Sequence, residues 1–315
     1  MPVTHPLWRH LRQCGQGYAA CWLLALLGTV MFGLLQAQGV FQGLELRLFD
    51  RLLLARTTPP AEERIVIIGE TEDDIRRYGH PLSDQVLAEA LTKLEQAGAR
   101  VIGVDKYRDQ AVAPGSERLD SVLLQYRNIV WIFFVGSSHN DAVSAPRVLI
   151  DDPERSGFND ILEDNDGVVR RGLLFIQVER QNHYAFPLLL SLHYLASEGI
   201  SAASDDQGFL ALNGVSLPPI DSEFGGYRTL DARGYQIMLE YPRLPHALTR
   251  FTLTQLLNDD IPSAALHDKI VLLGATASSL QDTRLLPNQL QRSGVEHHGY
   301  VVSQLLDTAL QRKRP

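Results

Sequence analysis

The chain alternates short apolar runs with segments in which apolar residues recur every three to four positions. Ile65–Glu70 and Val101–Asp105 are apolar runs rich in β-branched residues, and each ends in a carboxylate. Between them, apolar residues follow the 3.6-residue period of a helix. Ser83 is placed to cap this helix and Gly98 to end it. Two such strands around a helix predict a right-handed βαβ unit with parallel strands buried on both faces.

The same alternation continues to the end of the chain. A turn at Asp164–Gly167, with Gly167 supplying the positive φ, precedes a strand that we expect to be antiparallel. Residues 136–159 are polar and are expected to form a surface loop. Further apolar runs predict strands at 129–135, 168–178, 235–241 and 269–274, and helical periods predict helices at 116–126, 186–197, 253–257 and 294–310. The predicted fold class is α/β, a mixed and largely parallel sheet covered by helices and preceded by one N-terminal transmembrane helix.

The N-terminal region carries no charged residue from Gln13 to Leu44. Its apolar centre, from Tyr18 to Leu35, has about the length needed to cross a bilayer at about 1.5 Å per residue. We expect an uncleaved anchor here. A cleaved signal peptide and a buried core helix are the alternatives, although Leu35 stands where a cleavage site typically has a small residue. Arg9 and Arg12 before the span favour a cytoplasmic N-terminus and a main domain on the other side.

The expected organisation has four parts. Residues 1–17 are the cytoplasmic N-terminus, 18–37 the transmembrane anchor, 38–60 a stalk helix with a linker, and 61–315 the extracytoplasmic domain. Within the stalk, residues 44–54 are amphipathic and are expected to continue the anchor helix, with a plain packing helix as the alternative. Two threonines and two prolines at 57–60 break this helix.

Composition limits the classes of function. The 315 residues are 45% hydrophobic and 21% charged, as in an ordinary folded protein with a sizeable core. A formal net charge of −8 argues against a general nucleic-acid surface, so no nucleic-acid partner is expected. The two cysteines, Cys14 and Cys21, both lie near the N-terminus, so the main domain has no disulfide framework and no cysteine metal site.

Candidate chemistry gathers at the predicted strand ends. Ligand groups collect at the carboxyl ends of parallel strands, where Glu70 and Asp105 stand. Two carboxylates at adjacent strand ends are able to do acid–base work or bind a hard cation, whereas the alternative is that they cap turns. Asp164-Asn165-Asp166-Gly167 resembles the start of a calcium loop, but Phe175 occupies the twelfth position, which requires an acid. Other candidate side chains are those of Asp164, Asp166, Asp282, His297 and His298.

Arg170 and Arg171 are neighbours on a predicted strand and therefore point to opposite faces. We expect one of them to be buried against a carboxylate such as Asp105 or Asp282, and the other to be solvated. The alternative use of such an arginine is an anionic ligand. No Gly-x-Ser-x-Gly elbow and no His-Glu-x-x-His helix occurs in the sequence, so we expect neither a catalytic residue, nor a metal, nor a cofactor.

Several short motifs occur in a particular order over about residues 40–310. Phe49-Asp50 comes first, followed by a strand ending in Glu70 and a strand ending in Asp105. The later motifs are Asp164-x-Asp166-Gly167-Val168-x-Arg170-Arg171, the segment from Lys269 to Ala277 with Asp282, and Gly294-Val295-Glu296-x-His298. In this order they resemble the second type of CHASE domain, an extracellular sensor found in bacterial cyclases and kinases.

The resemblance implies an inner-membrane (cell-membrane) sensor whose main domain is periplasmic or extracellular. Such a domain binds a small-molecule or protein stimulus and passes the signal through its terminal helices to a cyclase or kinase output module. We also expect a homodimer, because a signal across a membrane usually needs relative motion of two copies. We expect the ligand-binding residues to be Glu70, Asp105, Arg170 and Asp282. We expect Leu48, Leu52 and His298 to take part in signal transmission. The alternative functions are a membrane-anchored α/β enzyme that uses the strand-end carboxylates, and a structural interaction protein with an exposed apolar patch.

Overall fold

The computed structural model describes residues 6–55, 62–136, 141–228, 230–241, 248–287 and 289–310, with side chains from Tyr18 onward. The chain divides into two compact units. Residues 1–49 and 221–231 form the first unit, and residues 50–220 and 232–315 form the second. The predicted linker at 57–60 lies outside the described residues.

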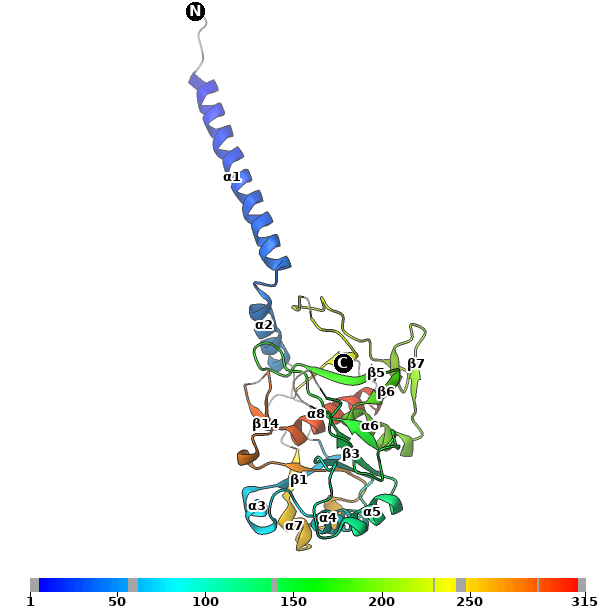
Figure 1. Cartoon of the computed structure of the whole chain (residues 1–315). Helices are drawn as coiled ribbons and strands as arrows, with labels where there is room; N and C mark the ends of the chain where they lie inside the picture. The colour runs from blue at the N-terminus through cyan, green and yellow to red at the C-terminus, as the bar shows by residue number, and fades with distance from the viewer. Residues whose placement is uncertain are drawn as a thin grey trace, which may run out of the picture. The chain divides into compact units, whose positions relative to one another are not determined.

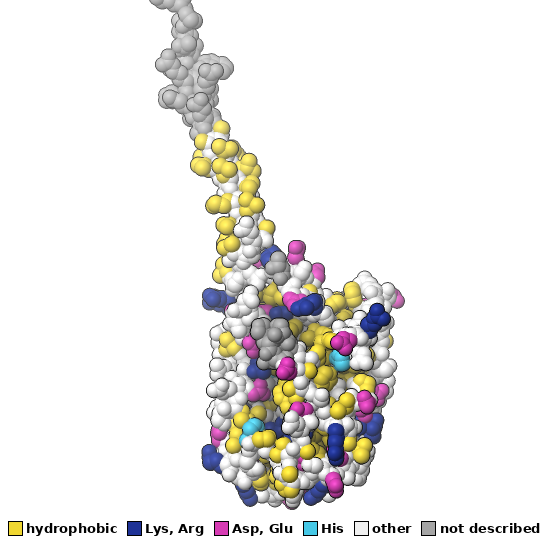
Figure 2. All heavy atoms as spheres, viewed as in Figure 1, with side chains coloured by type: hydrophobic (Ala, Val, Ile, Leu, Met, Phe, Trp, Pro, Cys, Tyr) yellow, Lys and Arg dark blue, Asp and Glu magenta, His cyan; other side chains and the backbone are white. Residues whose placement is uncertain are grey.

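The first unit is built on helix α1, Pro6–Ala37, and on the start of α2, Gln42–Ala55. Within α1, the window Tyr18–Ala37 is long and apolar enough to cross a membrane, and none of it is buried (Figures 1 and 2). Gly39, with φ of +73°, makes the turn between the two helices. The 221–231 segment contacts the start of α2, where the Arg228 backbone N–H donates to Gln42 Oε1 at 2.8 Å.

The second unit is organised around a six-stranded parallel sheet in the order β11-β1-β12-β2-β3-β4. Its strands are β1 Ile65–Glu70, β2 Val101–Asp105, β3 Ile129–Phe133, β4 Ser156–Phe158, β11 Thr249–Thr252 and β12 Ile270–Ala275. The central strands are buried on both faces, as their continuous apolar runs predict. β12, from late in the chain, lies between β1 and β2. The expectation of adjacent β1 and β2 ends is therefore wrong.

Helices cover both faces of this sheet. α6, Phe186–Ser197, and α8, Gly294–Leu310, lie on one face, and α4, α5 and α7 lie on the other (Figure 1). The bounds of the latter are α4 Asp84–Gln96, α5 Ser116–Gln125 and α7 Leu253–Leu257. As predicted, the Ser83 hydroxyl accepts from the Val86 backbone N–H at the start of α4, and Gly98 follows its end with φ of +77°.

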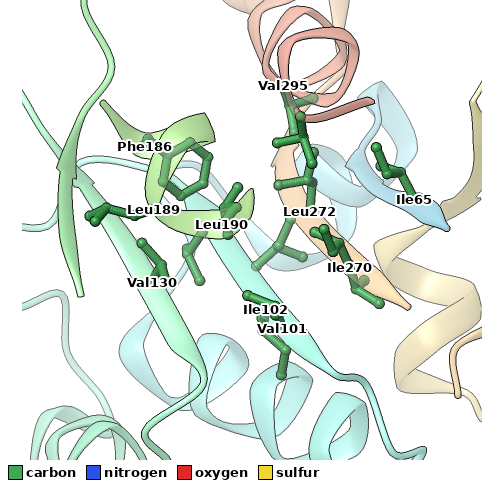
Figure 3. Packing of buried hydrophobic residues seen from close by; sticks show 14 of the residues in the cluster. Ile65, Val101, Ile102, Val130, Phe186, Leu189, Leu190, Ile270, Leu272 and Val295 are labelled. Carbon is green, nitrogen blue, oxygen red and sulfur yellow. The ribbon is translucent and has the colours of Figure 1, made fainter. Parts of the chain in front are cut away.

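The core between the sheet and helices α6 and α8 depends on close approach of these helices to strands β2 and β12. Phe186 and Leu190 of α6 and Val295 of α8 pack over β2 and β12 (Figure 3). A Cβ atom at Gly274 of β12 would lie 2.6 Å from the Cβ atom of Val295, so only glycine lets the first turn of α8 lie this close to the sheet end. The N-terminus of α8 is thereby brought to the carboxyl end of the sheet.

Smaller sheets complete the second unit. The antiparallel sheet β10-β5-β6 contains the predicted strand after Gly167, whose φ is +76°. Short α3, Glu72–Tyr78, was not predicted, because its seven residues are mostly charged and show no apolar period. The segment 136–159, expected to be a surface loop, instead contains β4 and the buried Leu149. The remaining strands are β5 Arg171–Val178, β6 Gln181–Tyr184, β7 Ala202–Ser204, β8 Leu210–Leu212, β9 Val215–Ser216, β10 Tyr235–Met238, β13 Thr283–Leu285 and β14 Gln291–Ser293.

Candidate functional site

Glu70, at the end of β1, is a fully buried carboxylate whose two oxygens both have partners. Lys106 Nζ donates to Oε2, and His80 Nδ1 lies 3.1 Å from Oε1. Lys106 follows directly on β2 and His80 follows α3, so the carboxylate ties together three separate segments. Both carboxylate oxygens therefore interact with side chains of the same domain, as expected of a buried polar group.

Asp105 ends β2, but it does not share a pocket with Glu70. In the parallel register Glu70 pairs with Ala275, whereas Asp105 pairs with Gly274, one row earlier. Successive residues of a strand point to opposite faces, so the two carboxylates lie on opposite faces of the sheet. The face of Gly274 and Asp105 is the one that α8 covers. An enzyme that uses Glu70 and Asp105 together would need one pocket for both, and this register does not form it.

Asp105, Asp282 and His298 come together at this edge and are named here the carboxyl-end cluster. Asp105 Oδ1 lies 4.0 Å from His298 Nε2, too far for a hydrogen bond, and the two side chains are only 6% and 3% exposed. Asp282 stands just before β13, where its carboxylate pairs with Arg284 Nη2 at 3.1 Å. A Cβ atom at Gly294, the first residue of α8, would lie 2.5 Å from Asp282 Oδ2. The start of α8 and the end of the sheet therefore bury Asp105 and His298, whereas Asp282 is 34% exposed at the edge of the cluster.

Burial controls the protonation of the cluster. It raises the pKa of Asp105 to about 6, although the charges of Lys106 and Arg284 oppose the shift. Burial, and then the charge of Asp105, raise the pKa of Asp282. Burial lowers the pKa of His298 to about 4, against the attraction of Asp282. His298 is therefore neutral near pH 7, and Asp105 holds its proton into a higher pH range than an ordinary aspartate.

A small cavity lies beside the cluster. His298 and Asp160 both line it, and His298 Nδ1 and Asp160 Oδ2 are buried without a hydrogen-bond partner among the described residues. Burial raises the pKa of Asp160. His297 lines the same cavity, and burial holds its pKa well below the usual range. The remaining lining residues are Phe158, Ile161, Arg171, Gly172, Leu173, Ala185, Pro187 and Val301.

Arg170 lies in a second polar site, away from Asp105 and Asp282. Its Nε and Nη2 atoms donate to Asp50 Oδ1 and Oδ2, each at 2.8 Å, in a bidentate pair with a residue of α2. Its Nη1 atom donates to Asp164 Oδ2 at 2.7 Å and to Asp166 Oδ1 at 2.9 Å. Burial alone would lower the pKa of Arg170, but these hydrogen bonds outweigh it and raise the pKa.

Arg171 is also buried, and the expectation that one of the two arginines is solvated is wrong. Arg171 Nε donates to Asp164 Oδ1 at 2.9 Å, and its Nη1 donates to Gln236 Oε1 at 2.6 Å on β10. The expected pairing of an arginine with Asp105 or Asp282 is wrong as well, because carboxylates from α2 and from the turn before β5 lie nearer. Asp50, Asp164, Asp166, Arg170 and Arg171 are named here the arginine network.

The sequence-predicted site residues thus separate into four places. Asp105, Asp282 and His298 meet in the carboxyl-end cluster, whereas Glu70 and Arg170 are each held elsewhere by their own partners. Leu48 and Leu52 are exposed on α2. Sequence reasoning did not single out Asp160 and Arg284. Asp160 follows β4, which at three residues is too short to give a hydrophobic pattern, and Arg284 lies on the similarly short β13.

The chain was also compared with known proteins. The model of the CHASE2 domain matches residues 24–315. No curated protein and no solved structure gives a match. The matched range includes the motif positions Asp50, Arg170 and Arg171 of the arginine network and Asp105, Asp282 and His298 of the carboxyl-end cluster. Since the match covers most of its length, the chain belongs to the CHASE2 domain family, a family of sensor domains.

Proposed function

We propose that the chain is a membrane-anchored, extracytoplasmic signal-input domain that passes a signal through its terminal helices to a cyclase or kinase output module. The observation that carries this proposal is the sensor-family match, which begins inside the apolar window Tyr18–Ala37 and continues through the folded unit. A sensor domain that directly follows a helix with an apolar, unburied surface of about bilayer length fits a protein held at a membrane.

The proposed orientation places residues 1–17 in the cytoplasm and residues 61–315 outside the inner membrane. Arg9 and Arg12 precede the apolar window and Glu45 follows it, and positive charge is retained on the cytoplasmic side. An uncleaved α1 then serves as the anchor. The lipid bilayer is the proposed binding partner of α1, and α2 is the segment that connects the anchor to the sensor unit.

Signal transmission through α2 is supported by the arginine network. Asp50 is on α2, and its bidentate pair with Arg170 joins this helix to the turn before β5. Both side chains are almost fully buried, so the pair has a defined geometry. A movement of the 164–171 segment would be transmitted to α2 through this ion pair. We infer that Arg170 positions α2 and that Asp105 and Asp282 remain the candidates for contact with a stimulus.

A homodimer is part of the same proposal. Leu44, Leu48 and Leu52 recur every four residues along α2 and are each more than half exposed. Residues at this spacing share one face of a helix. Two copies anchored in one membrane hold their α2 helices in parallel at the same height, which allows these leucines to face each other. Ligand or proton binding would then shift the balance between two arrangements of the paired helices.

Reporter fusions at Pro315 test the orientation. We expect alkaline phosphatase fused there to be active, because it requires export, and a fluorescent protein that matures only in the cytoplasm to stay dark. The reverse pattern would place the domain in the cytoplasm and overturn the proposal. A fusion of each reporter at Pro6 is the matched control, for which we expect the opposite pair of results.

A further inference from the structure

The carboxyl-end cluster contains a buried acid without a full set of partners. Asp105 is the last residue of β2, and its carboxylate accepts a hydrogen bond from the Asn159 side chain. Its nearest nitrogen on α8, His298 Nε2, is 4.0 Å away. Asp282 has a guanidinium partner in Arg284, whereas Asp105 forms no ion pair with an arginine or lysine within 4.0 Å among the described residues. An ionised Asp105 is therefore poorly compensated at this position.

The histidine beside Asp105 is equally incomplete. His298 Nδ1 is buried and has no hydrogen-bond partner among the described residues, and the same is true of Asp160 Oδ2. Both side chains line the small cavity next to the cluster. A proton that reaches this cavity meets two atoms that are able to take it up or pass it on, Asp160 Oδ2 and His298 Nδ1. The Asp105 carboxylate lies on the far side of the imidazole.

The charged and titratable groups that face Asp105 come from each neighbouring element. Lys106 and Tyr107 follow it on its own segment. Asp282 and Arg284 approach from β13 and the residue before it, and His298 approaches from α8. The titratable Asp160 and the neutral Asn159, which hydrogen-bonds to Asp105, follow β4, and His297 lines the neighbouring cavity. Asp105 and Asp282 repel each other when both are ionised, and this repulsion is relieved when one of them takes up a cation.

A proton suits this place better than a metal ion. Among the residues that the structure describes, no three His, Cys, Asp or Glu side chains are arranged to hold a metal. Arg284 also brings positive charge to the carboxylates. A proton needs no further ligands, and it converts Asp105 from a poorly compensated carboxylate into a hydrogen-bond donor toward the neutral His298.

We propose that Asp105 and His298, with Asp282 beside them, form a buried proton-binding site through which the domain responds to the pH of the compartment that it faces. This inference deepens the proposed function by naming the proton as a stimulus, and it rests on that function. When Asp105 is protonated, it is able to hydrogen-bond to His298 and draw the first turn of α8 to the sheet. When it is ionised, repulsion from Asp282 loosens the same contact.

A shared cavity and a series of ion pairs lie between this site and α2. The cavity that His298 lines is also lined by Arg171. Arg171 binds Asp164, Asp164 binds Arg170, and Arg170 binds Asp50 of α2. A change in the shape of this cavity would therefore reach Arg171, and from Arg171 the ion pairs continue to α2.

Hydrogen–deuterium exchange of the full chain, purified in detergent, tests the site. Exchange of the peptide that covers the start of α8, corrected for the intrinsic pH dependence of exchange, is measured from pH 4.5 to 8. We expect protection to fall by about tenfold as pH rises, with a midpoint near the ionisation of Asp105. Asp105→Asn should abolish the transition, and Asp260→Asn, at an exposed aspartate, should leave it unchanged.

His298→Gln is a second variant, and its amide is able to donate to an ionised Asp105. Because this donor stabilises the carboxylate, the midpoint should move to lower pH without loss of the transition. The proposal is wrong if wild type shows no transition, if Asp105→Asn keeps it, or if Asp260→Asn loses it. These readouts do not depend on which side of the membrane the domain occupies, so they fail independently of the reporter fusions that test the proposed function.

Discussion

Asp105 and His298, in the carboxyl-end cluster, should contribute to the pH dependence of the free energy of unfolding with opposite signs. The pKa of Asp105 is raised from 3.8 to about 6 in the folded protein, so its contribution to stability is full below pH 3.8 and is lost as pH rises through about 6. The pKa of His298 is lowered from 6.5 to about 4, so its contribution is full above pH 6.5 and is lost as pH falls through about 4.

The magnitudes of these two contributions to the free energy of unfolding follow from the pKa shifts of Asp105 and His298. A shift of one pKa unit corresponds to about 1.4 kcal/mol, so the shift of Asp105 corresponds to about 3 kcal/mol and that of His298 to about 3 kcal/mol of opposite sign. Between pH 4 and 6 the folded protein keeps its proton on Asp105 and the unfolded chain keeps one on His298. The number of bound protons is then nearly the same in both states, so the two contributions almost cancel in wild type.

Single variants remove this cancellation. From pH 3.5 to 7.5, the free energy of unfolding of Asp105→Asn should rise relative to wild type by about 3 kcal/mol. That of His298→Gln should fall relative to wild type by a smaller amount, because the introduced amide also lowers the pKa of Asp105. The assay is urea unfolding at each pH, followed by the fluorescence of the buried Trp131 in a background with Trp8→Phe and Trp22→Phe. Curves for both variants that stay parallel to wild type across this range would refute the assigned protonation states.

Three further predictions concern packing, ion pairs and association. Arg170→Gln should lower the free energy of unfolding by about 3–5 kcal/mol in urea titrations, because it leaves the buried Asp50 carboxylate unpaired, whereas Arg147→Gln in an exposed pair should leave the free energy of unfolding nearly unchanged; equal losses would contradict the structural role of Arg170. Gly274→Ala should cost about 1–3 kcal/mol by the same assay through collision with Val295, and Val295→Ala in the same chain should recover part of this loss; additive losses would show that the two sites do not touch. Leu48→Ser with Leu52→Ser should reduce the dimer fraction in analytical ultracentrifugation while changing unfolding by less than about 0.5 kcal/mol, and an unchanged dimer fraction would exclude this face of α2 as the interface.

The elements of the fold were accessible from the sequence because each has its own periodicity. The apolar runs at 65–70, 101–105 and 269–274 and the periodic segment before Gly98 correspond to observed strands and to α4. The strand order was not accessible, because β12 is as apolar as its neighbours and no pattern indicates that it inserts between β1 and β2. Short elements such as β4 and α3 have too few residues for a period to emerge.

The candidate site was only partly predictable for a related reason. Asp105, Asp282 and His298 were identified as separate candidates, and their meeting depends on Gly274 and on the path of α8. The opposite orientation of Glu70 and Asp105 follows from a register difference of one row, which the sequence of a single strand does not contain. The partner of Arg170 is Asp50, at a separation of 120 residues, and no local pattern links the two.

Surface labelling of single cysteines tests the central claim, an extracytoplasmic sensor on an uncleaved anchor, without any fused domain. Cys14 and Cys21 are replaced by serine, and one cysteine is introduced either at the exposed Asp260 or at Thr4. In intact spheroplasts treated with a membrane-impermeant maleimide, Asp260→Cys should be labelled, and Thr4→Cys should be labelled only after permeabilisation. Labelling of Thr4→Cys in intact spheroplasts, with Asp260→Cys protected until permeabilisation, would contradict the proposed topology and with it the sensor function.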